Sequence, residues 1–324
     1  MGYLKIFLFY IVCLLIPLVV QAKDAASYFE EAYEIEKSSP LFAIPLYENI
    51  LNNIKNKDIN KTAISRLFYL YVKYNMYEEV FLFNKKHSPN KSRKKNTSKI
   101  IEKLSKRLGL SPLELSSIIS LAVSADKSTH PLLVEKYKLK PSIELFHLIF
   151  SIKMKVPDTE GIAYLLSESP NANPIFRLAY FLKAKPESLR KAFFDMASIS
   201  ALSTQQKMDM LYLYGLHLRN QRRYKLSARY LWMSSSYNPY KRKNYIDIST
   251  VELAKTLIIS GRSSEACSFL KPGKILIRNE GDELLDLYCK QKNTLKIKKL
   301  KPSLQILAQR ENGLFFKKIL RIIN

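Results

Sequence analysis

Glycine is scarce in this sequence, with only eight glycines among 324 residues, while hydrophobic residues make up 47% of the chain. A sheet protein needs glycine for its tight turns, whereas helices joined by short proline- or serine-marked turns do not. No long segment alternates apolar and polar residues with a period of two, so no strand is predicted. The sequence therefore predicts an all-α fold whose unit is the antiparallel helix pair.

Motifs for catalysis and metal binding are also missing. The histidines form no His-x-x-x-His pair, there is no Cys-x-x-Cys, no Gly-rich phosphate loop and no nucleophile elbow. The pair Glu187-Ser188 resembles the catalytic pair of soluble lytic transglycosylases, but the Gly-rich and Gly-Leu-Met-Gln stretches expected downstream are absent. Lys185-Pro186-Glu187 is better explained as a helix start with an acid in its first turn. We therefore predict no catalytic residue, no metal site and no cofactor.

The N-terminus has the pattern of a secretory signal peptide. Lys5 precedes an apolar run from Ile6 to Val20, and cleavage is predicted after Ala22. An uncleaved inner-membrane anchor formed by residues 6–20 is the alternative, although the run is shorter than the roughly 20 residues that a spanning helix needs. The sequence thus predicts an exported, periplasmic protein with residues 1–22 removed.

Cysteine and acidic residues are few. Apart from Cys13 in the predicted signal peptide, only Cys267 and Cys289 are present; in an oxidising compartment they either pair or remain separate core residues. Lys and Arg total 53 against 28 Asp and Glu, a net charge of +25. Outside the cytosol, the counter-charges are anionic lipids, acidic wall polymers and acidic proteins, and nucleic acid is not expected. Much of this charge serves solubility.

Helical patterns follow one another along the chain. Apolar residues recur at helical spacing over four segments, which are residues 25–37, 41–52, 61–74 and 77–86. The segment 88–99 has no apolar residue and is interpreted as a basic linker between hairpins at 23–87 and a helical-repeat domain at 100–324. Ser111 and Glu114 form the pattern of a capping box. Later prolines at one-helix intervals are interpreted as helix starts: Pro131, Pro141, Pro157, Pro174 and Pro186.

One stretch, residues 208–241, fits a repeat pattern. Its positions follow W-x2-L-G-x2-Y…A-x3-F…P, and they are filled by Leu211, Tyr214, Gly215, Leu218, Tyr224, Ser227, Leu231, Ser234 and Pro239. Residues 247–271 fit it in part, with Leu253, Ala254, Leu257, Gly261, Ala266 and Leu270. These segments resemble divergent tetratricopeptide repeats. The resemblance implies that small residues at Gly215 and Ser227 let two helices cross closely.

The same resemblance implies a solenoid with a protein-binding groove. The first helices of the two repeats would line it with Asp209, Tyr212, Leu216, Arg219, Val251, Lys255 and Ile258. Aromatic and basic groups beside apolar ones suit an extended acidic peptide. The carboxylate-clamp subfamily is not matched, because Tyr212 and Leu216 occupy the places that would carry its chemistry.

The C-terminus contains a short basic amphipathic helix, predicted at residues 314–323. It either caps the solenoid or docks on an anionic membrane, and we favour the cap because solenoids need capping ends. The overall prediction is an exported, non-catalytic scaffold for proteins of a cell-envelope assembly, such as a secretion, outer-membrane or flagellar-motor complex. A binding protein for membrane or wall polymer that uses the basic surface is the alternative.

Overall fold

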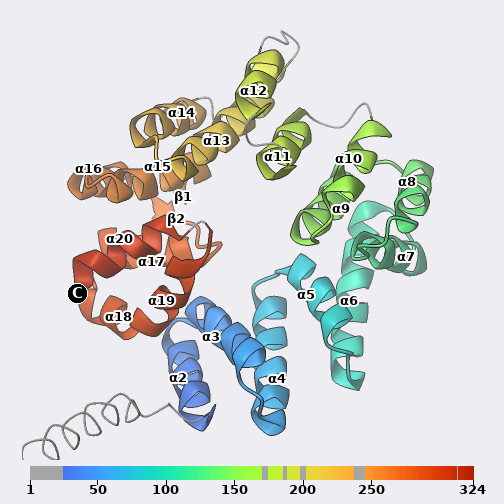
Figure 1. Ribbon diagram of the computed structural model, residues 1–324, viewed down its shortest axis with the longest axis horizontal. Helices are drawn as coiled ribbons and strands as arrows, with labels where there is room; N and C mark the ends of the chain where they lie inside the picture. Colours follow the sequence, from blue (N-terminus) through green and yellow to red (C-terminus); the bar gives the residue numbers. More distant parts are fainter. Residues whose placement is uncertain (1–24, 170–173, 185–187, 198–201, 237–244, 312) are drawn as a thin grey trace, which may run out of the picture. The chain divides into compact units, whose positions relative to one another are not determined.

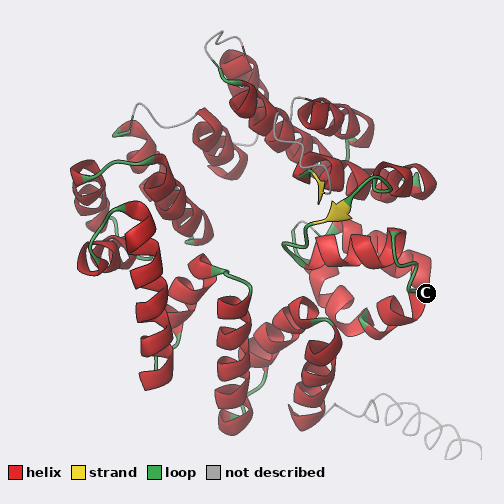
Figure 2. Cartoon of the chain, turned by 180° about the vertical axis from the view of Figure 1, so that it is seen from behind, coloured by secondary structure: helices red, strands yellow, loops and turns green. Residues whose placement is uncertain are grey.

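The structure, a computed structural model, describes residues 25–169, 174–184, 188–197, 202–236, 245–311 and 313–324. Helices make up most of these residues, which confirms the all-α class (Figures 1 and 2). The chain divides into two compact units, one ending at Leu67 and the other beginning at Phe68. The predicted signal peptide, Pro186, Glu187 and Pro239 lie outside the described residues.

The first unit contains α2 (Ala25–Ser38), α3 (Pro40–Asn53) and most of α4 (Lys57–Lys73). The buried Glu36 carboxylate on α2 accepts hydrogen bonds from the Tyr47 hydroxyl on α3, at 2.8 Å, and from the Arg66 guanidinium on α4. Arg66 approaches both carboxylate oxygens, the fork geometry that arginine favours. One acidic side chain therefore ties the three helices together.

The second unit contains the rest of α4 and the remaining helices in chain order, which Figure 1 labels along the ribbon. They are α5 (Tyr77–Lys86), α6 (Lys91–Leu108), α7 (Pro112–Ala122), α8 (Thr129–Leu139), α9 (Ile143–Lys155), α10 (Thr159–Ser167), α11 (Pro174–Ala184), α12 (Leu189–Ala197), α13 (Thr204–Asn220), α14 (Tyr224–Ser236), α15 (Ile248–Ile259), α16 (Ser263–Phe269), α17 (Glu280–Cys289), α18 (Thr294–Lys299), α19 (Lys301–Gln309) and α20 (Leu314–Ile323).

Local signals explain several helix starts. The Ser111 hydroxyl accepts from the backbone N–H of Glu114, whose side chain bonds back to Ser111, so the predicted capping box is confirmed. Prolines lie in the first turns of α8 and α11 and two residues before α9 and α10, as expected of helix starts.

The prediction of a basic linker at residues 88–99 is wrong, because α6 begins at Lys91 and runs through this segment. Asn90 caps the helix by accepting from the backbone N–H of Arg93. The apolar contacts that hold α6 come from its second half, where Ile100 and Leu104 are buried. A segment without apolar residues is therefore helical because it continues a helix that is anchored further along.

Two very short strands depart from the prediction of no strand. β1 (Tyr245–Ile246) pairs in parallel with β2 (Lys274–Ile275), a contact of two residues on each side, drawn as yellow arrows in Figure 2. Cys267 on α16 and Cys289 on α17 form a disulfide with a Cα–Cα distance of 5.0 Å, which settles the choice that the sequence left open. The disulfide joins two helices of the C-terminal part.

The helices α13 and α14 follow one another in the chain and pack closely against each other. A Cβ atom added to Gly215 would lie 2.8 Å from the Leu231 Cγ atom, so only glycine fits the crossing without displacement. The buried Ser227 hydroxyl donates to the Gly215 carbonyl at 2.7 Å, and Ser234 donates to the Met208 carbonyl at 2.7 Å. Tyr214, Leu218 and Leu231 are buried, Leu211 is half-buried against the same core, and Tyr224 begins α14.

Candidate functional site

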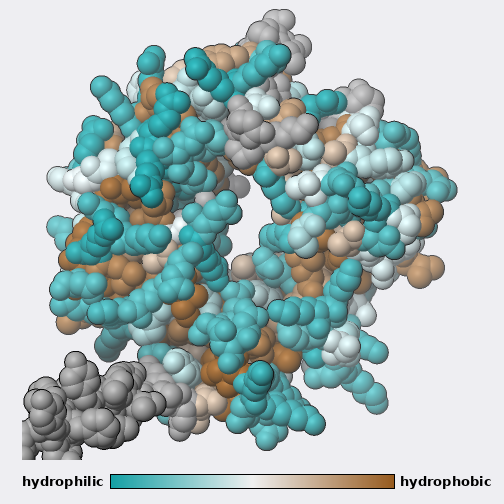
Figure 3. Space-filling model, in the orientation of Figure 1, coloured by the Kyte–Doolittle hydropathy of each residue, from teal (hydrophilic) through white to brown (hydrophobic). Residues whose placement is uncertain are grey.

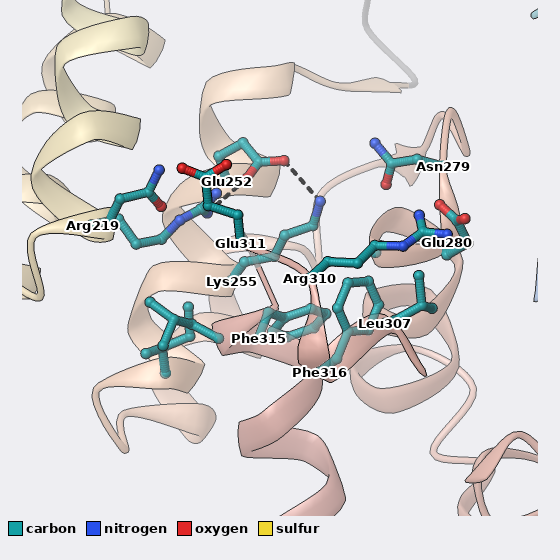
Figure 4. A pocket seen from close by; sticks show the side chains of 14 residues that line it. Arg219, Glu252, Lys255, Asn279, Glu280, Leu307, Arg310, Glu311, Phe315 and Phe316 are labelled. Carbon is teal, nitrogen blue, oxygen red and sulfur yellow. Dashed lines mark hydrogen bonds and ion pairs between the residues drawn. The ribbon is translucent and has the colours of Figure 1, made fainter. Parts of the chain in front are cut away.

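Two of the predicted groove residues line one cavity in the second unit. Arg219 lies in the last turn of α13 and Lys255 in the middle of α15, and both border a cavity of about 390 Å³. The other walls come from the start of α17, the end of α19 and the start of α20. Figure 4 shows Lys255, Arg310, Phe315 and Phe316 around the same space.

One wall includes part of a chain of ion pairs, here called the open cluster: Arg219, Glu252, Lys255, Arg278 and Asp282. Of these, Arg219, Glu252 and Lys255 line the cavity. Glu252 accepts from the Arg219 Nη1 and the Lys255 Nζ, each at 2.7 Å. Lys255 Nζ also donates to Asp282 Oδ1 at 2.7 Å, and Arg278 Nε donates to Asp282 Oδ2 at 2.7 Å. Three cations and two carboxylates thus alternate without a break.

Local structure places each member of the open cluster. Glu252 and Lys255 are three residues apart and therefore share one face of α15. Asp282 lies in the first turn of α17, which Asn279 caps by accepting from the Asp282 backbone N–H. Gly281 lets Lys255 come close, because a Cβ atom there would lie 3.1 Å from Lys255 Nζ.

Electrostatics keep the open cluster charged. Burial would raise the pKa of Glu252, but the charges of Lys255 and Arg219 and their hydrogen bonds outweigh it and hold this pKa at about 2. Burial, together with the nearby Glu252 carboxylate, raises the pKa of the Tyr212 hydroxyl. Tyr212 is therefore neutral and Glu252 ionised at neutral pH.

The lower wall is largely apolar and comes from the C-terminal helices. Phe315 is buried and Phe316 half-buried; Leu307 and Leu314 complete this side, and Arg310 and Glu311 border it. The helix α20 packs against α15, α18 and α19, with Ile319 also buried. The cavity therefore offers an apolar surface opposite a charged one, which suits an amphipathic peptide segment.

The other predicted groove residues do not all face solvent. Val251 and Ile258 are almost completely buried, which corrects their assignment as groove-lining residues, because α13, α14, α16 and α20 all pack against α15. Asp209, Tyr212 and Leu216 are half-buried on α13. The Asp209 carboxylate accepts from Gln205 Nε2 at 2.9 Å, and burial raises its pKa. Of the seven predicted residues, Arg219 and Lys255 line the cavity, and the Lys255 side chain is only 6% exposed.

A second group of buried charges lies on α8, α9 and the start of α10, and we call it the closed cluster: His130, Lys153 and Asp158. Asp158 Oδ2 lies 2.8 Å from His130 Nε2 and 3.0 Å from Lys153 Nζ, and Asp158 Oδ1 accepts from the Gly161 backbone N–H at 2.9 Å. Lys153 is completely buried and also donates to the Ser124 carbonyl at 2.5 Å. The contacts of this cluster hold neighbouring helices and their loops together.

The sequence contained few signals for the full site. The spacing of Glu252 and Lys255 on one helix face was visible in the sequence, but Asp282 and Arg278 come from 23 or more residues further along. Phe315 and Phe316 belong to the amphipathic C-terminal segment, whose packing partner the sequence did not identify. Within the described part of the chain, no three His, Cys, Asp or Glu side chains gather closely enough to hold a metal ion.

Comparison with known proteins adds no relative. No protein-family profile, curated protein or solved structure matches this chain. Among the described helices, none combines the length and the apolar character that are needed to cross a bilayer.

Proposed function

We propose that this protein is an exported, non-catalytic scaffold of tetratricopeptide-like hairpins that binds another protein in a cell-envelope assembly. The observation that supports the proposal is the close contact of α13 and α14, where Gly215 lies against Leu231 and the Ser227 hydroxyl donates to the Gly215 carbonyl. The following hairpin, α15–α16, supports the same register, with Leu253, Ala254, Leu257, Ala266 and Leu270 buried.

The partner segment binds, in this proposal, at the cavity beside the open cluster. An apolar side chain of the partner packs on Phe316 and Leu314, while polar groups meet Arg219 and Lys255. The two carboxylates of the cluster already neutralise most of its positive charge, so we expect a peptide with apolar and polar groups in alternation rather than a strongly acidic one. Hot-spot residues of interfaces commonly combine an aromatic group with arginine.

Photo-crosslinking in intact cells tests this assignment. A photoreactive phenylalanine analogue replaces Phe316 at the cavity and, as a control, replaces Trp232, which is 56% exposed on α14. We expect one discrete protein adduct from position 316, lost when Arg310→Glu is added, and none from position 232. Circular dichroism confirms that each variant is folded. Equal adducts from both positions, or adducts with lipid or wall fragments, would contradict the proposal.

A further inference from the structure

The helix α6 carries a row of lysines along its solvent face. Its members, here called the basic stripe, are all exposed: Lys91, Lys95, Lys99, Lys103 and Lys106. A helix rises 1.5 Å per residue, so the stripe is about 22 Å long, with most lysines one turn apart. The stripe lies opposite the buried Ile100 and Leu104. In the region where Figure 1 draws α6, Figure 3 shows hydrophilic surface interspersed with hydrophobic patches.

Few opposite charges compensate the stripe. Glu102 is the one acidic residue within α6, and it pairs with Lys106 at 3.0 Å. Lys103 Nζ donates to the Tyr77 hydroxyl at 3.3 Å, a neutral group. Because these contacts are exposed to water, they are weak and neutralise little of the positive charge of the lysines. The stripe is therefore a strongly cationic surface.

Three apolar side chains are highly exposed beside the C-terminal end of the stripe. They are Leu113 on α7 at 83% exposure, Leu139 at the end of α8 at 74%, and Ile143 at the start of α9 at 62%, here called the apolar trio. Ion pairs join the sequence neighbours of these residues: Lys140 lies 3.7 Å from Glu114, and Arg107 of α6 lies 3.7 Å from Glu144. The segments that carry the trio therefore lie near the C-terminal end of α6.

We propose that the basic stripe and the apolar trio together dock this protein on an anionic lipid membrane. Lysines near a charged bilayer gain electrostatic energy from the lipid head groups, and a few inserted apolar side chains add partitioning into the interface. A linear polyanion in water would leave the leucine and isoleucine side chains exposed to solvent, so these side chains would not contribute to its binding. Single-stranded nucleic acid is bound with several aromatic stacking platforms, whereas Tyr77 is the one aromatic residue found here in contact with a lysine of the stripe in the described part of the chain. The combination therefore favours lipid.

Vesicle co-sedimentation of the full-length protein tests this docking surface. The vesicles contain 30% phosphatidylglycerol in phosphatidylcholine, and pure phosphatidylcholine vesicles give the baseline. The N-terminal apolar segment is the same in every variant, and binding to the pure phosphatidylcholine vesicles measures its contribution. Replacing Lys91, Lys95, Lys99 and Lys103 with Gln should weaken binding about five-fold for each charge, hence by at least about 100-fold in total.

Two matched controls separate this surface from the general properties of the chain. Lys225, Lys271, Lys298 and Lys301 are equally exposed, and replacing them with Gln removes the same charge from other helices and turns; we expect binding to fall less than about ten-fold by the general effect of charge. Replacing the apolar trio with Ser should cost about ten-fold. The same change at the exposed residues Leu276, Ile277 and Leu295 should leave binding unchanged.

Two outcomes would overturn the proposal. Equal losses in the two lysine variants would mean that net charge alone drives binding. Full vesicle binding by the trio variant, with displacement of the parent protein from vesicles by soluble polyphosphate, would show that the stripe binds linear polyanions instead. Near-ultraviolet circular dichroism, recorded for every variant, confirms native packing before binding is compared.

Discussion

The open and the closed cluster are two solutions to the same problem, which is how a helical core holds buried charge. In the closed cluster, Lys153 is completely buried and its ammonium group meets one carboxylate and one backbone carbonyl. In the open cluster, Lys255 meets two carboxylates, and Arg219 and Arg278 stand at the ends of the chain of ion pairs. The open cluster also borders a cavity.

This difference indicates which charged side chains could exchange a partner within the protein for a ligand. In the closed cluster, Lys153 and His130 share the single carboxylate of Asp158. The open cluster has three cations for two carboxylates, so removal of one contact leaves another partner in place. Redundant pairing beside a cavity is what a binding site requires, because a ligand must displace water or a protein contact when it enters.

The largest expected effect is on the closed cluster. Lys153→Ala leaves Asp158 buried with one fewer partner and opens space beside the Ser124 carbonyl, so the free energy of unfolding should fall by about 3–5 kcal/mol. Urea denaturation monitored by circular dichroism measures it. Lys155 on the same helix is the matched control, because its pair with Glu79, at 2.9 Å, is partly exposed. Lys155→Ala should lower the free energy of unfolding by no more than about 1 kcal/mol. A similar decrease in both variants would mean that burial does not make Lys153 more important than Lys155.

A smaller loss is expected from the corresponding lysine of the open cluster. Lys255→Ala leaves Glu252 paired with Arg219, and Asp282 paired with Arg278, and water from the cavity reaches the vacated place. The free energy of unfolding should therefore fall by about 2–3 kcal/mol, less than for Lys153→Ala. The same urea denaturation compares the two. If Lys255→Ala proved the more damaging, the redundancy argument would be wrong.

Acid titration sharpens the comparison, because both clusters contain a carboxyl group with a lowered pKa. Burial would raise the pKa of Asp158, but bonds from Gly161, Lys153 and His130 outweigh it and lower it from 3.8 to about 2, and that of Glu252 falls from 4.5 to about 2. The unfolded chain binds these protons at higher pH, so the stabilisation is present above about pH 4.5 and lost as pH falls towards 2. Asp158 should contribute about 2 kcal/mol and Glu252 about 3 kcal/mol.

Measured stability between pH 5 and 2 checks this titration. Asp158→Asn and Glu252→Gln should each flatten the curve of unfolding free energy against pH, and the double variant should flatten it by the sum, since the two clusters share no partner. A parent curve that stays level down to pH 2 would show that neither carboxyl has the lowered pKa. Flattening in one variant alone would identify the cluster that does.

Much of the secondary structure could be predicted, because it depends on residues that are close together in the sequence. The segment 77–86 coincides with α5, and Ser111 with Glu114 caps α7, since capping and helical spacing depend on neighbours in sequence. The helicity of residues 91–99 could not be predicted, because the apolar contacts that hold α6 lie beyond them. The site was found in part: Arg219 and Lys255 were expected, whereas the partner Asp282 depends on how α17 packs against α15.

The smallest expected effect concerns two glycines, one beside each cluster. Each glycine lies in the first turn of its helix. A Cβ atom on Gly161 would lie 2.5 Å from Asp158 Oδ2 and 2.7 Å from His130 Nε2, and the closed cluster leaves those groups no room to move. A Cβ atom on Gly281 would lie 3.1 Å from Lys255 Nζ, the end of a flexible side chain beside a cavity. Both changes to Ala gain similar helix propensity.

Gly161→Ala should therefore lower the free energy of unfolding by about 1–3 kcal/mol through overpacking. The free energy of unfolding of the Gly281→Ala variant should be closer to that of the parent by about 1 kcal/mol or more, because Lys255 can shift while it keeps a carboxylate partner. Paired urea denaturation curves measure the difference. Equal destabilisation would mean that the open cluster is as rigid as the closed one. In that case a ligand entering the cavity would find Lys255 fixed, and the binding role proposed for it would have to pass to Arg310 and Phe316 on the opposite wall.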